Sequence, residues 1–285
     1  MGEKQNYTIK INEIGTDHIG IGEILKFYNY AKQYRYCQIQ LNVSTVNSID
    51  ANLSALILAI VHKLKEENKV SVFIILGDGM GVFYRNGLVS HLSGKGNENI
   101  YGDVRESTIP LTVFGNEDED SFCQYLRKDF FGHRGLDKLS LTTRMSLSTH
   151  FEEIFCNAVM HANSTYPMYA CGQYFPVKKI LKFTFVDLGD GFLKKISEQT
   201  NGEIKKDKDA ILWSTYKLNS TKDVKAFGPG GLGLKELKKY CNENNGSLHI
   251  CSGNGYVNFI KDKTMEQELT YHLKGSLVNL IFRDI

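Results

Sequence analysis

A glycine-rich turn that opens a helix constrains this chain more than any other feature. The stretch Phe227–Leu234 reads FGPGGLGL, and Leu234–Asn242 continues with helical spacing. Glycines in this position leave backbone N–H groups free to point at one place, with the positive end of the helix dipole behind them. No Gly-Lys-Ser/Thr follows, so the turn is not a Walker loop. The sequence therefore predicts a phosphate-binding turn of another kind.

A long helix is predicted upstream, over Ser140–Ala162. Its apolar residues from Phe151 onward fall on one face, whereas Glu153, Asn157 and His161 follow one another at four-residue steps on the opposite face. Polar outer faces are normal in amphipathic helices. This pattern alone therefore leaves a simple solvated face open as the alternative to a binding site.

A strand predicted at Lys182–Val186 leads directly into the sequence DLGDG at 187–191. An acid at a strand end, followed by two spaced glycines, places a hydrogen-bond acceptor beside a tight turn. Because glycine has no side chain, a flat base can lie against the backbone there. The alternative is a hairpin turn of type I′ at Asp190-Gly191.

In this order, the patterns Glu-x-x-x-Asn, Asp-x-Gly-x-Gly and Gly-x-x-Gly-x-Gly-Leu resemble the GHKL superfamily of ATP-binding domains. That superfamily includes gyrase subunits, certain chaperones, sensor histidine kinases, mismatch-repair ATPases and anti-sigma-factor serine kinases. The resemblance covers 121–285, and FEEIFCNAVMHA at 151–162 is most similar to the anti-sigma-factor kinases. It implies an α/β sandwich in which helices cover a mixed sheet.

The resemblance implies ATP and magnesium as cofactors and gives individual residues roles. Asn157 would be a ligand of Mg²⁺, and Glu153 would be the general base for water or a hydroxyl group. Asp187 would accept a hydrogen bond from the adenine amino group, while Gly189 and Gly191 would shape the turn.

The resemblance also places phosphates at the glycine-rich turn and a mobile lid at 192–230. Gly231 and Gly233 would donate from the backbone, Lys222 and Lys225 would approach the γ-phosphate, and Ser276 would support the adenine site. The residues expected at the nucleotide are Glu153, Asn157, Asp187, Gly189, Gly191, Lys222, Lys225, Gly228, Gly230, Gly231, Leu232, Gly233 and Ser276.

The first hundred residues predict a smaller α/β layer. Strand patterns at 7–11, 37–43 and 70–76 alternate with helical patterns at 21–32, 50–67 and 81–92, and the helix at 50–67 has a one-sided apolar stripe. The segment 36–92 resembles STAS domains. Asp50 is followed by Ala51 and Asn52, so the phosphorylatable serine of the STAS turn is missing. The resemblance implies a non-catalytic docking or regulatory domain.

We therefore expect an α/β protein of two domains. A STAS-like domain would cover 1–95 and a GHKL-type ATP-binding domain 121–285. The residues between them, 96–120, are rich in glycine, asparagine and acidic side chains. This composition predicts a linker, with one edge strand at Ile109–Phe114.

Charge and composition narrow the functions. The 285 residues are 42% hydrophobic and 23% charged, which is typical of a folded globular protein. The net charge of +2 does not favour nucleic acid. No apolar run approaches the roughly 20 residues that span a bilayer, and the N-terminus lacks an apolar signal core, so we expect a cytoplasmic location. The six cysteines include no CxxC pair, so we expect neither disulfides nor a zinc site.

Three classes of function fit these patterns. The first is an ATP-dependent regulator that hydrolyses ATP or phosphorylates a partner protein on serine or threonine. The second is a nucleotide-gated switch without chemistry, and the third, disfavoured by charge, is a DNA-associated ATPase. Histidine autophosphorylation is disfavoured because neither His133 nor His150 lies in a recognisable phosphoacceptor helix. The expected partners are ATP or ADP, a regulated protein and, in a homodimer, a second copy of the chain, but no membrane.

Overall fold

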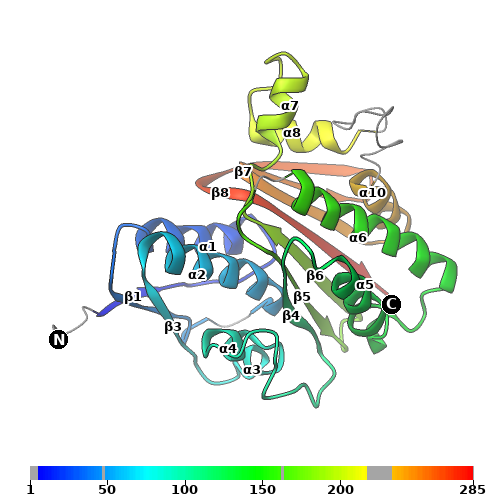
Figure 1. The fold of residues 1–285 in the computed structure, drawn as a ribbon. Helices are drawn as coiled ribbons and strands as arrows, with labels where there is room; N and C mark the ends of the chain where they lie inside the picture. Colours follow the sequence, from blue (N-terminus) through cyan, green and yellow to red (C-terminus); the bar gives the residue numbers. More distant parts are fainter. Residues whose placement is uncertain (1–5, 47–48, 162–163, 217–232, 285) are drawn as a thin grey trace.

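The computed structural model describes residues 6–46, 49–161, 164–216 and 233–284. They form four layers, namely a three-stranded sheet, a pair of helices, a five-stranded sheet and a second group of helices (Figure 1). One apolar core surrounds the pair of helices, and another lies on the opposite face of the five-stranded sheet. The predicted α/β class is confirmed.

The first layer is a parallel sheet in the order β1-β2-β3, in which Ile9 pairs with Leu41 and Leu41 with Ile74. Parallel neighbours need crossover connections, and helices α1 and α2 provide them. The elements are β1 (Asn6–Lys10), α1 (His18–Ala31), β2 (Gln38–Asn42), the 3-10 turn η1 (Ala51–Leu53), α2 (Ser54–Asn68), β3 (Ser71–Ile75), α3 (Val82–Arg85) and α4 (Leu88–Leu92).

The second sheet has the order β4-β5-β6-β8-β7, and all four pairs of neighbouring strands are antiparallel. The mixed sheet expected from the GHKL resemblance is therefore wrong for the described strands. Short turns at 176–179 and 261–262 join β5 to β6 and β7 to β8, and such hairpins impose antiparallel pairing. The strands are β4 (Thr108–Phe114), β5 (Met168–Phe175), β6 (Ile180–Asp187), β7 (Ser247–Ile260) and β8 (Lys263–Arg283).

Helices rich in aromatic residues cover the far face of this sheet. Phe122 stacks on Phe155 with ring centroids 4.7 Å apart. The elements are α5 (Glu119–Tyr125), η2 (Leu126–Phe130), η3 (Arg134–Leu136), α6 (Leu141–His161) and α10 (Gly233–Glu243), while α7 (Leu193–Gln199) and α8 (Asp207–Ser214) stand at one end, near β7 (Figure 1). No helix in the described part of the chain combines the length and apolar character that a membrane crossing requires.

The edge strand predicted at Ile109–Phe114 is confirmed, because β4 forms one edge of the second sheet. Leu111 belongs to the first apolar core, whereas Ile109 and Phe114 belong to the second. These residues within 96–120 are thus part of the folded core. The domain boundaries at 95 and 120 stay a prediction.

Helix α2 is buried on both faces, which corrects the one-sided stripe expected from the sequence. Ala55, Leu58 and Ala59, which lie outside that stripe, are as fully buried as Leu56 within it. The helix packs against β3 on one side and against β5 and β6 on the other. A helix between two sheets needs apolar residues all round, and the run LSALILAIV at 53–61 provides them.

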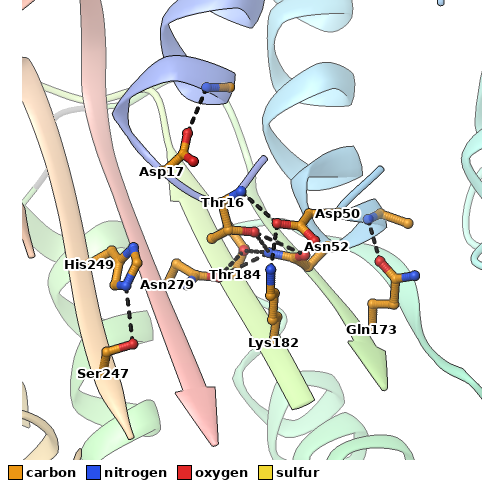
Figure 2. Close-up of polar contacts among 12 residues, drawn as sticks. Thr16, Asp17, Asp50, Asn52, Gln173, Lys182, Thr184, Ser247, His249 and Asn279 are labelled. Carbon is orange, nitrogen blue, oxygen red and sulfur yellow. Dashed lines mark hydrogen bonds and ion pairs between the residues drawn. The ribbon is translucent and has the colours of Figure 1, made fainter. Parts of the chain in front are cut away.

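A buried polar cluster joins the start of α2 to the second sheet (Figure 2). The side-chain nitrogen of Asn52 donates to Thr184 Oγ1 on β6 at 2.7 Å and to Asn279 Oδ1 on β8 at 2.9 Å. Beside it, the Asp50 carboxylate accepts from Lys182 Nζ at 2.5 Å. Because buried polar groups are costly unless they are hydrogen-bonded, these contacts specify how the two layers fit together.

Candidate functional site

Asp187 lies at the end of β6, on the face that α6 covers. Side chains alternate along a strand, so Phe183, Phe185 and Asp187 share one face. Phe151 of α6 packs against both phenylalanines, with ring centroids 6.0 and 5.3 Å apart. The change from apolar to acidic residues along β6 therefore places the carboxylate where the apolar core ends.

Two hydrogen bonds hold the Asp187 carboxylate. The Gly189 backbone N–H donates to Oδ1 at 2.9 Å, and the hydroxyl of Ser276, opposite Asp187 on β8, donates to Oδ2. Burial raises the pKa of Asp187 above its ordinary value, and the two hydrogen bonds oppose this shift. These hydrogen bonds fix the direction of the carboxylate.

The turn after Asp187 leads into a helix. Because α7 begins at Leu193, the alternative of a hairpin turn at Asp190-Gly191 is wrong. Gly191 has a φ of +70°, and a Cβ there would lie only 2.5 Å from Ser252 Oγ on β7. Glycine alone tolerates both conditions, and it lets the turn pass close to β7.

Glu153 and Asn157 lie one turn apart on α6, and both are half-buried. Their neighbours Phe151 and Phe155 are buried against the sheet, as predicted. Glu153 faces the start of α10, because a Cβ placed on Gly233 would lie 3.1 Å from its Oε2 atom.

Helix α10 begins directly against α6. A Cβ on its first residue, Gly233, would lie 3.1 Å from both the His150 carbonyl oxygen and Glu153 Oε2. Lys235, two residues further on, is buried. Burial lowers the pKa of this lysine, and the nearby carboxylates of Glu153 and Glu236 oppose the shift. The small glycine thus permits close contact between the first turn of α10 and the acidic face of α6.

The described parts of the three stretches singled out in the sequence pack against one apolar core. Phe192 after the Asp187 turn, Ala158 of α6 and Leu234 of α10 all pack against it. Asp187, Gly189, Gly191 and Ser276 form one group at the sheet end. The remaining predicted residues, Lys222, Lys225, Gly228, Gly230, Gly231 and Leu232, lie outside the described residues.

Two residues at the site were missed by the sequence analysis, namely Ser252 and Lys235. Ser252 stands in the stretch HICSGNGY, where two glycines interrupt the strand pattern and hide the strand. The same glycines could have indicated the site, because a glycine inside a strand is typical of a bulge or of a close backbone approach. Lys235 stands in an ordinary amphipathic pattern, LKELKK, which contains no sign of its burial.

The described part of the chain contains no ready-made metal centre of acidic, histidine or cysteine side chains. Among the residues that the structure describes, no group of three or more His, Cys, Asp or Glu side chains is placed to hold a metal. Magnesium is commonly held by one or two protein oxygens together with substrate phosphates and water. The role of Asn157 as a magnesium ligand stays a prediction.

Comparison of the chain with protein-family models, with curated proteins and with solved structures gives no match.

Proposed function

We propose that this chain binds ATP with magnesium between Asp187, α6 and the start of α10, and that it regulates a partner protein. The observation that best supports this is the convergence of the predicted stretches. Gly233 packs on α6 at Glu153. Asp187 shares its face of β6 with Phe185, which packs on Phe151 of the same helix.

The Asp187 group suits an adenine base. An ionised carboxylate only accepts hydrogen bonds, and the 6-amino group of adenine only donates them. Ser276 and the Gly189 N–H fix the direction of the carboxylate. Ser252 fills the space beside Gly191, so a flat ring would lie against the backbone at Gly189.

The junction of α6 and α10 suits the phosphates. Free N–H groups and the helix dipole favour anions at the start of a helix, and the ammonium group of Lys235, near the carboxylate of Glu153, adds positive charge there. Asn157 would hold the magnesium ion, and the bound ion would neutralise charge on the phosphates. Glu153, one turn away, would take a proton from water or from a hydroxyl group of the partner.

The N-terminal layer supports a regulatory role. The turn at 50–52 of the STAS-like segment contains no serine, and its Asp50 and Asn52 side chains bond to β6 and β8. We infer a domain that docks and is not itself phosphorylated. An ATPase or serine/threonine kinase acting on a separate protein, as in partner switching, fits this arrangement.

Labelled ATP tests the proposal. The pure chain is incubated with Mg-ATP, with and without proteins that co-purify with it, and free phosphate and protein-bound label are both followed. We expect label on a partner for a kinase and free phosphate for an ATPase. Tight binding with neither product would contradict catalysis and leave a nucleotide-gated switch, and no binding at all would refute the proposal.

A pair of adjacent variants tests the base. Glu153→Ala should keep ATP affinity and lose turnover by about 100-fold, the usual scale of a general base. Glu152→Ala is the matched control, because its carboxylate accepts from Ser148 Oγ at 3.0 Å on the same helix. Equal turnover in the two variants would contradict the role of Glu153.

A further inference from the structure

Ser252 lies on β7 beside the turn that follows Asp187. It is buried, with 1% of its surface exposed, and it stands opposite Ser276 on β8. Immediately after this pair the register between β7 and β8 shifts, between Ser252 and Gly253. Ser252 is thus the last regular position of β7 before an irregular segment of the ladder.

The hydroxyl group of Ser252 both accepts and donates a hydrogen bond. It accepts a hydrogen bond from the Phe192 backbone N–H at 3.1 Å and donates one to the Gly275 carbonyl oxygen at 2.9 Å. Phe192 ends the turn that Asp187 begins, and Gly275 precedes Ser276, whose hydroxyl bonds to Asp187. These contacts close a ring that runs from Asp187 through Ser252 and back through Ser276.

The ring is tightly packed. A Cβ on Gly191 would lie 2.5 Å from Ser252 Oγ, and a Cβ on Gly275 would overlap the backbone carbonyl oxygen of Asp187. Close-packed groups cannot readjust one at a time without moving their neighbours. Loss of the Ser252 hydroxyl would leave the Phe192 N–H and the Gly275 carbonyl without this partner, and the turn would shift together with the Asp187 carboxylate.

We propose that Ser252 is the positioning residue of the base subsite. It acts through Phe192 and Gly275 to fix the direction of the Asp187 carboxylate, and it thereby sets the preference for a purine with a 6-amino group over one with a 6-oxo group. This inference rests on the proposed nucleotide site.

Binding of ATP and of inosine triphosphate, each with magnesium, to the full chain tests the role of Ser252 by titration calorimetry. Ser252→Ala should bind ATP about tenfold more weakly, with a smaller change for inosine triphosphate, because the lost alignment acts on the 6-amino contact. The ratio of the two affinities should therefore fall. Ser252→Cys keeps the shape of the side chain with a larger atom that is only a weak donor, and its ratio should lie between those of Ser252→Ala and the wild type.

Ser247→Ala is the matched control. Ser247 is a buried serine on the same strand, and its hydroxyl lies 3.1 Å from His249 Nε2. This variant should keep the wild-type ratio of affinities, even where its melting temperature falls. The control therefore distinguishes a general loss of stability in β7 from the expected fall in the ratio of the two affinities.

A wild-type ratio in Ser252→Ala would overturn the proposal, and if that variant does not fold, a wild-type ratio in Ser252→Cys would do the same. Asp187→Asn separates the two levels of inference. If Asp187→Asn binds ATP like the wild type, the nucleotide site itself is wrong. If it loses ATP while the Ser252 variants keep the wild-type ratio, the role of Ser252 alone is wrong.

Discussion

Replacement of Asp187 by asparagine should weaken ATP binding strongly without unfolding the protein. The amide oxygen can accept from the Gly189 N–H, and the amide nitrogen can donate to the Ser276 hydroxyl, which is free to rotate. Each retained hydrogen bond contributes about 1 kcal/mol. The variant also removes a charge that burial disfavours. We therefore expect the free energy of unfolding to stay within about 1 kcal/mol of the wild-type value or to rise, which is a change of a few degrees in Tm.

ATP binding should respond in the opposite direction. In the proposed complex the Asp187 carboxylate accepts from the adenine amino group. In the variant the amide nitrogen donates one N–H to Ser276, and its other N–H would face that amino group. Two donors that face each other in a partly buried site cost roughly 1–3 kcal/mol, and more when the lost bond was charge-assisted. The Kd for ATP should rise by about 5-fold to more than 100-fold.

The pH dependence of stability gives a second readout for Asp187. Burial raises the pKa of this carboxyl in the folded state above its unfolded value, so the folded chain binds the proton more readily. As the pH falls from neutral through the folded pKa, the wild type should gain stability relative to Asp187→Asn. Urea unfolding of both proteins over this range, without nucleotide, measures the gain. A loss of more than about 3 kcal/mol in Asp187→Asn, or an unchanged ATP affinity, would refute the reasoning.

Three further changes test the packing. Asn52→Ala should lower the free energy of unfolding by about 2–4 kcal/mol in urea titrations, because it removes the buried hydrogen bonds to Thr184 and Asn279. A loss below about 0.5 kcal/mol would contradict a stabilising role of the buried polar cluster. Gly275→Ala should lower the free energy of unfolding by more than about 3 kcal/mol, since the φ of Gly275 is +102° and a Cβ would overlap the backbone. The helical control Gly22→Ala should raise it by about 0.5–1 kcal/mol, and similar effects of the two substitutions would contradict the role of Gly275. Burial lowers the pKa of His249 from 6.5 to about 4, so the folded chain loses stability as the pH falls through this range. His249→Gln should flatten that loss, and an unchanged slope would rule out His249 as its cause.

Local patterns in the sequence predicted the elements that carry the site. The strand before Asp187, the helix with Glu153 and the helix after the glycine-rich turn lie within a few residues of their predicted bounds. Apolar spacing and glycine placement are local signals, so they can be read without the fold. The resemblances to GHKL and STAS domains remain predictions.

The contacts between distant segments could not be predicted in this way. Helix α2 is buried all round because β5, which begins at Met168, and β6 cover its second face. The partners of Asn52 and Ser252 depend on the register of β6, β7 and β8. The hydrophobic pattern within one stretch does not determine which residues of two distant strands pair with each other. The mixed sheet was expected from the family resemblance, whereas the two hairpins in this chain impose antiparallel neighbours.

The most direct measurement of the central claim is photolabelling of the full chain with 8-azido-ATP and magnesium, followed by mass spectrometry of the labelled peptides. We predict label on the segments around 187–192 and 275–276, and we predict that excess ATP removes it. Label elsewhere on the chain, or label that excess ATP does not displace, would contradict an adenine nucleotide bound between Asp187, α6 and α10.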